Sequence, residues 1–164
     1  EKVYLRVRRI QCAVAQTPTA TPANLRYLTV QDILWINLQV TKKVNDFDFA
    51  KLEEAVFYQY GYGSSKDIIS QAERFAGSFA TLAPFTAGNL ASAFVGAATF
   101  LYLNGHDLAV EDRVASGWFA EIARGNGNLR NQVEGSPTRY EDVEAATRAV
   151  LAKYGATVEA LSAV

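Results

Sequence analysis

The stretch that decides the fold is residues 83–104, which read APFTAGNLASAFVGAATFLYLN. The part from Asn89 to Asn104 is apolar nearly all round, and a helix of that kind is buried on every side. Gly105 follows and predicts the end of this helix. The preceding residues, 83–88, have the frame of a phosphate-binding loop that leads into a helix. None of their side chains can accept a proton, hold a metal or pair with a phosphate, so we expect a buried central helix behind a loop without reactive groups.

Composition restricts the class of protein. The chain has 164 residues, 49% of them apolar and 20% charged, as in an ordinary globular domain. Its net charge of −1 provides no general attraction to nucleic acid or to acidic membranes, so we expect neither as a partner. With one cysteine, Cys12, and one histidine, His106, it can form neither an internal disulfide nor a multi-histidine metal centre. We therefore expect a cytoplasmic protein with no bound metal.

Signals for helix ends surround the central helix. Thr29, followed three residues later by an acid, predicts a capping box for a helix that runs to about Val44. Asp48 predicts the N-cap of a second helix, with Phe49, Leu52, Val56 and Tyr60 on one face. Further helices are predicted over about 66–81, over about 111–124, and from a second capping box at 138–141 to a stop at Gly155. Residues 28–164 thus predict one all-α domain, a bundle of about six helices.

Residues 1–27 differ from this pattern and predict an N-terminal arm and linker. Apolar side chains at 3, 5 and 7 alternate with Tyr4, Arg6 and Arg8, which suits a short edge strand or an extended arm. Two prolines within residues 16–24 indicate a linker. The basic residues Lys2, Arg6, Arg8 and Arg9 favour a solvated arm, with contact to an acidic partner or a nucleic acid as the alternatives.

The order of these elements resembles the Fic/Doc (death-on-curing) family. Four short pieces between about residues 28 and 125 carry the resemblance: Leu28-Thr29, KLEEAV at 51–56, Pro84-Phe85-x-x-Gly88-Asn89, and FLYLNG at 100–105. The resemblance implies that the loop and the following helix N-terminus bind nucleotide phosphates. It also implies a small β-hairpin flap near 61–65, in which Gly61, Tyr62 and Gly63 bind a target peptide by strand addition. A plain loop between helices is the alternative for that segment.

Three motif positions depart from the family. Active members have a histidine as general base where this chain has Ala83, an acid that holds Mg²⁺ at Ala87, and a phosphate-binding arginine at Ala91. Phe85, Gly88 and Asn89 match the motif, and Ser92 matches a small hydroxyl residue that is common after the arginine. Loss of a general base alone typically costs about 10²–10⁴-fold in rate. We therefore expect a catalytically degenerate domain that needs no cofactor, although the family would use ATP and Mg²⁺.

The sequence thus predicts a binding or interaction module, whose partner would be a protein such as an antitoxin or a target peptide. Weak nucleotide or phosphate binding at the N-terminus of helix 89–104 would involve Phe85, Thr86, Gly88, Asn89 and Ser92. The alternative for these residues is that they only form the turn and pack the core. The rival functions are an active transferase that moves AMP or a phosphate to a protein hydroxyl by a diverged mechanism, and a non-catalytic remnant of a toxin–antitoxin pair. The aromatic residues 57–62 favour core and rim packing, with a binding patch as the alternative.

Overall fold

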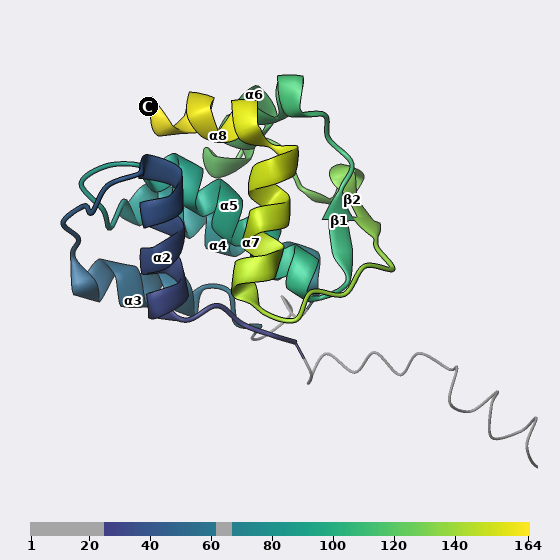
Figure 1. The fold of residues 1–164 in the computed structure, drawn as a ribbon, viewed down its shortest axis with the longest axis horizontal. Coiled ribbons are helices and arrows are strands. Elements are labelled where there is room, and N and C mark those ends of the chain that lie inside the picture. Colours follow the sequence, from purple (N-terminus) through teal and green to yellow (C-terminus); the bar gives the residue numbers. More distant parts are fainter. Residues whose placement is uncertain (1–24, 62–66) are drawn as a thin grey trace, which may run out of the picture.

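The computed structural model describes residues 25–61 and 67–164 (Figure 1). Within these ranges it contains seven α-helices and one two-stranded sheet, which confirms the predicted all-α class. The helices are α2 (Val30–Thr41), α3 (Phe49–Phe57), α4 (Ile68–Leu82), α5 (Asn89–Leu103), α6 (Asp112–Ala123), α7 (Val143–Lys153) and α8 (Gly155–Ser162). The sequence predicted about six; the additional helix is α8.

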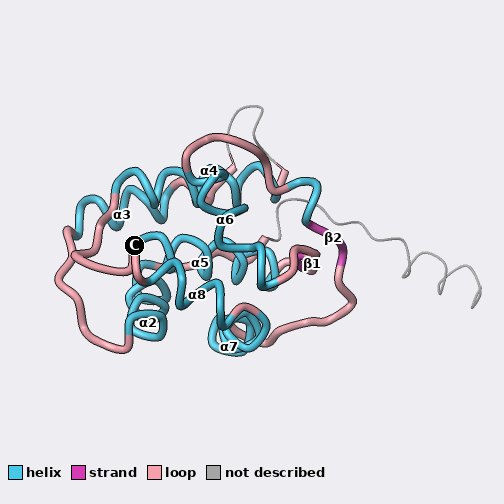
Figure 2. The backbone as a smooth tube through the Cα atoms, turned by 90° about the horizontal axis from the view of Figure 1, so that it is seen from above, coloured by secondary structure: helices cyan, strands magenta, loops and turns pink. Residues whose placement is uncertain are grey.

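Helix α5 is the centre of the bundle, as its apolar sequence predicted. Every residue from Ala91 to Leu103 is buried, and the helix packs against α2, α4, α6, α7 and α8. Figure 2 shows α5 between a side formed by α3 and α4 and a side formed by α2 and α7. Gly96 permits close packing with α4, because a Cβ atom there would lie 2.9 Å from Cε1 of Phe75. No helix in the described ranges is long and apolar enough to cross a membrane.

Two of the predicted N-caps are confirmed. The Thr29 hydroxyl accepts from the Asp32 amide at 3.1 Å while the Asp32 carboxylate accepts from the Thr29 amide at 2.8 Å, which is a complete capping box. Asp48 caps α3 by accepting from the Lys51 amide at 3.1 Å. Helix α2 is shorter than predicted, because Lys42 adopts a left-handed conformation with φ of 62° and ends it after Thr41.

The capping box predicted at 138–141 is wrong. Helix α7 begins later, at Val143, with Asp142 as its N-cap. The guanidinium of Arg26 donates to the backbone carbonyls of Tyr140 and Glu141, at 2.7 Å and 2.6 Å. These long-range hydrogen bonds hold residues 140 and 141 in the loop before the helix.

Gly155 was predicted to stop the last helix, and instead it begins α8. No side chain of α8's own segment caps this helix. The Asp112 carboxylate, on α6, accepts from the amides of Ala156 at 3.1 Å and Thr157 at 2.9 Å, and from the Thr157 hydroxyl at 2.6 Å. A carboxylate 44 residues away from Ala156 therefore supplies the cap, and the chain continues as a helix after a sharp change of direction.

The sheet pairs β1 (His106–Leu108) with β2 (Val133–Gly135) in antiparallel register, His106 opposite Gly135. It lies beside the C-terminal end of α5 (Figure 1). The sequence predicted no strand here. The predicted hairpin near 61–65 falls mostly on residues outside the described part of the chain, as do Tyr62, Gly63 and the arm residues 1–24.

Candidate functional site

The motif loop between α4 and α5 is fastened to the segment that joins α2 to α3. The Asp48 amide donates to the Pro84 carbonyl at 2.8 Å, and the Thr86 amide donates to the Asp46 carbonyl at 3.0 Å. These bonds make a short antiparallel bridge between Phe47 and Phe85. The Phe85 ring is only 5% exposed, and its centroid lies 6.0 Å from that of Phe47 and 6.2 Å from that of Phe79. Phe85 is therefore an anchor of the loop in the core.

Asn89 closes the loop on itself. Its carboxamide oxygen accepts from the Phe85 amide at 2.9 Å, and its Nδ2 donates to the Phe85 carbonyl at 2.7 Å. The N-cap of α5 is Gly88, with φ of 75°, and no side chain makes a capping hydrogen bond there. The side chain of Asn89 thus stabilises the turn.

A buried amide network lies beneath the loop. Asn37 of α2 is 2% exposed, and its Nδ2 donates to the Ala87 carbonyl and to the Ser92 hydroxyl oxygen, both at 3.0 Å. Its Oδ1 accepts from Nδ2 of Asn45 at 2.9 Å. Because Ser92 is fully buried, its hydroxyl faces α2 and not the surface. The sequence analysis did not predict this network; Asn37, a polar residue between the buried Ile33 and Val40 of α2, was the signal that could have indicated it.

Gly88 brings the loop against α2. A Cβ atom at Gly88 would lie 2.3 Å from Cγ2 of Thr41, far inside contact distance. The position also has a left-handed φ that disfavours other residues. Gly88 therefore serves the close approach of α2 to the start of α5, and this face of the loop is covered by protein.

The three alanines of the motif do not occupy equivalent environments. Ala83 is exposed at the C-terminal end of α4, with φ of 44°, and Ala87 is half-buried. Ala91 is fully buried in the core. The positions of the family's base and metal ligand thus reach the surface, whereas the position of its arginine does not. His106 cannot replace the base, because it follows the opposite end of α5, roughly 22 Å away along the helix axis.

Of the predicted flap, the structure describes Gly61 alone. Gly61 is exposed and lies close to Gln71, since a Cβ atom there would be 3.2 Å from Cδ of that side chain. Gln59 is buried next to it, donates to the Leu28 carbonyl at 2.6 Å and accepts from the Leu28 amide at 2.7 Å. The end of α3 is therefore fixed to the start of the domain.

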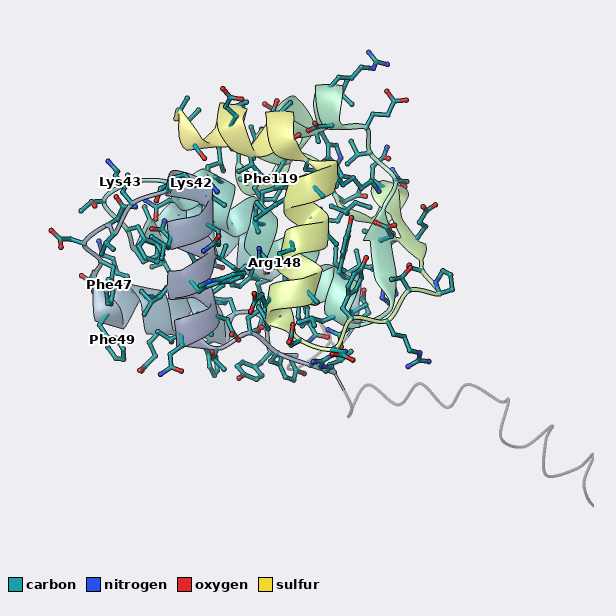
Figure 3. The ribbon with its side chains drawn as sticks, viewed as in Figure 1. Lys42, Lys43, Phe47, Phe49, Phe119 and Arg148 are labelled. Atoms are coloured by element: carbon teal, nitrogen blue, oxygen red, sulfur yellow. The ribbon has the colours of Figure 1, made fainter. Side chains whose placement is uncertain are left out.

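Large aromatic side chains are exposed along α3 and at its two ends. We call the following four residues the α3 aromatic surface: Phe47 (43% exposed), Phe49 (58%), Phe57 (57%) and Tyr60 (40%). Phe49 was predicted to face inward and is instead one of the most exposed. Figure 3 shows Phe47 and Phe49 projecting from one end of the molecule, with Lys42 and Lys43 at the nearby end of α2. Of the aromatic residues 57–62, for which a binding patch was the alternative, Phe57 and Tyr60 are exposed, Tyr58 is half-buried, and Tyr62 lies outside the described residues.

Elsewhere, a groove of about 500 Å³ lies between α4 and the end of α6, with Glu73, Arg74 and Arg124 at its polar wall. The groove does not include the motif loop.

Among the described residues, no group of three metal-ligand side chains is close enough to hold an ion. Two carboxylates respond to local hydrogen bonds: the Ser70 hydroxyl lowers the pKa of Asp67 to about 2, and the Thr157 hydroxyl lowers the pKa of Asp112. Both act as helix caps.

Comparisons with protein-family models, with curated proteins and with solved structures found no match for this chain. The Fic/Doc resemblance therefore rests on the sequence alone.

Proposed function

We propose that this chain is a catalytically degenerate Fic/Doc-like domain that acts as a protein-interaction module. The main support for this proposal is that the side chains of the retained motif residues contact other parts of the same protein. Phe85 packs in the core, Asn89 binds the backbone of Phe85, and Ser92 binds Asn37. The residues that a ligand would need already have partners inside the protein, and the three reactive positions carry methyl groups.

The α3 aromatic surface supports the interaction role. Phe47 belongs both to this surface and to the bridge with Phe85, so the surface is continuous with the motif loop. Aromatic side chains, phenylalanine among them, are enriched at protein interfaces relative to the rest of the protein surface. The occupant we propose is a protein segment, in keeping with the antitoxin-like or target-peptide partner, and we retain a cytoplasmic location as part of this proposal.

The catalytic part is tested by incubating the purified chain with labelled ATP, Mg²⁺ and a protein lysate. We expect no label above that of a heat-treated sample. Labelling of a lysate protein that disappears with Ala87→Trp would support the diverged transferase and overturn the degenerate-domain hypothesis. Calorimetry with ATP and ADP tests the residual phosphate site, for which we expect no heat, because Asn89 and Ser92 are already bonded.

Restoring the motif tests the family resemblance. Ala83→His and Ala87→Asp add the base and the metal ligand at an exposed and a half-buried position. Ala91→Arg would force a charged side chain into the core and cost several kcal/mol. We expect the double variant to remain folded by circular dichroism, and a gain of Mg²⁺-dependent nucleotide binding over the native chain would support the resemblance.

The interaction part is tested with tagged variants in a lysate. Phe49→Ser with Phe57→Ser should abolish recovery of a partner that the native chain retains. Val114→Ser on α6 is the matched control, since Val114 is 46% exposed but lies on another helix. Equal recovery with both variants would exclude the α3 aromatic surface as the binding site.

A further inference from the structure

We propose that residues 1–10 of this chain dock on the exposed face of α3, over Phe49, Glu53 and Phe57. The inference concerns the same surface as the proposed function but does not depend on the lost chemistry or on an external partner.

The docking face is a straight stripe. Phe49, Glu53 and Phe57 are spaced four residues apart on α3, so they lie on one side of the helix with a repeat of roughly 6 Å. Both phenylalanines are more than half exposed. The Phe57 ring lies 6.0 Å from that of Tyr60, which extends the apolar stripe past the end of the helix. An unpartnered face of this kind has apolar area to bury.

The charged residues of segment 46–60 are mainly acidic, and the Arg74 guanidinium lies at the Tyr60 end, where it donates to the Tyr58 carbonyl at 3.1 Å. Glu53 and Glu54 are both exposed, and neither takes part in an ion pair with the described residues 25–61 and 67–164. Asp46 and Asp48 add negative charge at the other end, and Lys51 is the one exposed cation within residues 46–60. The net charge of this segment therefore attracts a basic chain.

Residues 1–10, EKVYLRVRRI, have the matching chemistry. They contain four basic residues and one acid, which gives them a positive charge. Tyr4, Arg6 and Arg8 alternate with apolar residues and would repeat every ~6.6 Å along an extended segment, close to the repeat of the stripe on α3. Arg6 then faces Glu53 while Tyr4 and Arg8 face the two phenylalanine rings. Arginine suits both contacts, because its guanidinium pairs with carboxylates and stacks on aromatic rings.

The connection is long enough for docking within one molecule. Shortly after its start at Leu25, the described chain passes the C-terminal end of α3, where the Tyr27 ring lies 4.4 Å from that of Tyr60 and the Leu28 amide donates to Gln59. Residues 11–24 connect this point to the arm and can span up to roughly 46 Å, against roughly 14 Å for the whole of α3. A tether of that length holds the arm at a high effective concentration and favours its own domain over a second copy.

Lys42 and Lys43 set the limit of the docking site. They lie beyond Phe47, at the end of α2 (Figure 3), and repel a basic arm. The arm is therefore centred on Glu53 and leaves Phe47 uncovered. A protein that binds the whole α3 aromatic surface must displace the arm.

Cys12 makes a direct test available, because it is the chain's single cysteine and closely follows residues 1–10. A nitroxide on Cys12 of the ¹⁵N-labelled full chain should broaden the amide signals of Phe49, Glu53 and Phe57 strongly, and that of Val114 on α6 weakly. Arg6→Glu with Arg8→Glu should abolish the difference. Adding Glu53→Arg and Glu54→Arg to that variant should restore it, since the charges are then exchanged and both glutamates are exposed.

Three results would overturn the proposal. The first is broadening that is equal on α3 and α6. The second is a difference that persists between 0.1 M and 1 M salt, where the screening length falls from about 10 Å to about 3 Å. The third concerns a mixture of two samples, one carrying the nitroxide but no ¹⁵N and the other carrying ¹⁵N but no nitroxide. Broadening seen mainly in this mixture would assign the arm to a second copy. Because no partner or nucleotide is present, none of these results bears on the proposed function.

Discussion

Helices α5 and α8 both begin without a capping side chain from their own first turn, but the residues that stabilise their N-termini differ. At α8, the Asp112 carboxylate arrives from α6 and accepts from two backbone amides. At the N-terminus of α5, no carboxylate among the described residues makes a capping hydrogen bond. The loop instead folds back on itself through Asn89, and α2 closes over it through Asn37 and Thr41.

The difference separates two uses of a helix start. A helix N-terminus carries partial positive charge, and an anion near it is stabilised. At α8 the protein supplies that anion from its own chain, so this terminus has a structural role. At α5 the loop is held by its close packing against Thr41 and by the amide side chains of Asn37 and Asn89, so these residues maintain the shape of the loop. The same backbone feature therefore need not imply the same function.

The largest expected effect is at Gly88, where the closure of α5 by α2 is tightest. Gly88→Val should destabilise the protein by about 2–5 kcal/mol, because it adds a β-branched residue at positive φ and collides with Cγ2 of Thr41. Chemical denaturation measures the change. Gly77→Ala in α4 is the control; a Cβ atom there would have nothing within 4 Å, so the change should be neutral or stabilise by up to about 1 kcal/mol. A tolerated Gly88→Val would mean that α2 does not close the loop.

Next comes the amide network. Asn37→Leu should cost about 2–4 kcal/mol, since it leaves the Ala87 carbonyl, the Ser92 hydroxyl and the Asn45 amide without their buried partner. Thr86→Ala, at an exposed position of the same loop, should change the free energy of unfolding by less than about 0.5 kcal/mol. If the two variants proved equally stable in urea, the network would not contribute to the free energy of unfolding.

The cap of α8 is predicted to contribute slightly less. Asp112→Ala should lower stability by about 1.5–3 kcal/mol and should increase hydrogen exchange in residues 155–162 more than in α5, because the two amides lose a charged acceptor. Glu111→Ala removes a neighbouring carboxylate whose ion pair with Arg113 is mostly exposed, and should cost less than about 1 kcal/mol. Unchanged exchange in α8 after Asp112→Ala would contradict the long-range cap.

Acid should affect the capped helices by the smallest amount. The folded pKa of Asp67 is lowered from 3.8 to about 2, mainly by the Ser70 hydroxyl, and that of Asp112 is also lowered. A lowered folded pKa adds stability above pH 3.8 that is lost as the pH falls toward 2. At the half-exposed Asp67 this amounts to about 1 kcal/mol after screening. Thermal unfolding of Asp67→Asn should show a flatter decline between pH 4 and pH 2 than the native chain; parallel curves would exclude Asp67 as a source of acid sensitivity.

The sequence predicted those parts of the fold that depend on neighbours along the chain. The buried α5 followed from its continuous apolar residues, the cap at Thr29 from the acid three positions later, and the cap at Asp48 from the preference of aspartate for this position. The errors arose where a distant residue intervenes. Arg26 holds residues 140 and 141 out of α7, and Asp112 turns Gly155 from a stop into a start.

The candidate site was predictable in outline but not in its bonding. The family resemblance drew attention to the loop and its three alanines, but the sequence did not show that Ala91 lies in the core or that Ser92 faces Asn37. Phe49 was placed on one helix face with Leu52 and Val56 because of its spacing, yet those two residues are buried and Phe49 is 58% exposed. Helical spacing orders residues around an axis, but only tertiary packing decides how far the buried sector extends.

The central position of α5 also has a consequence for synthesis on the ribosome. Its last residue, Leu103, is made about fifty residues before the first residue of α8, and both α7 and α8 cover the apolar surface of α5. At a synthesis rate of about 5–20 residues per second, the apolar surface of α5 stays uncovered for roughly 3–10 s before α8 begins to be made. A nascent chain with so apolar an unfinished core is a natural client for chaperones that bind hydrophobic segments, and slower translation of residues 104–154 should increase its dependence on them.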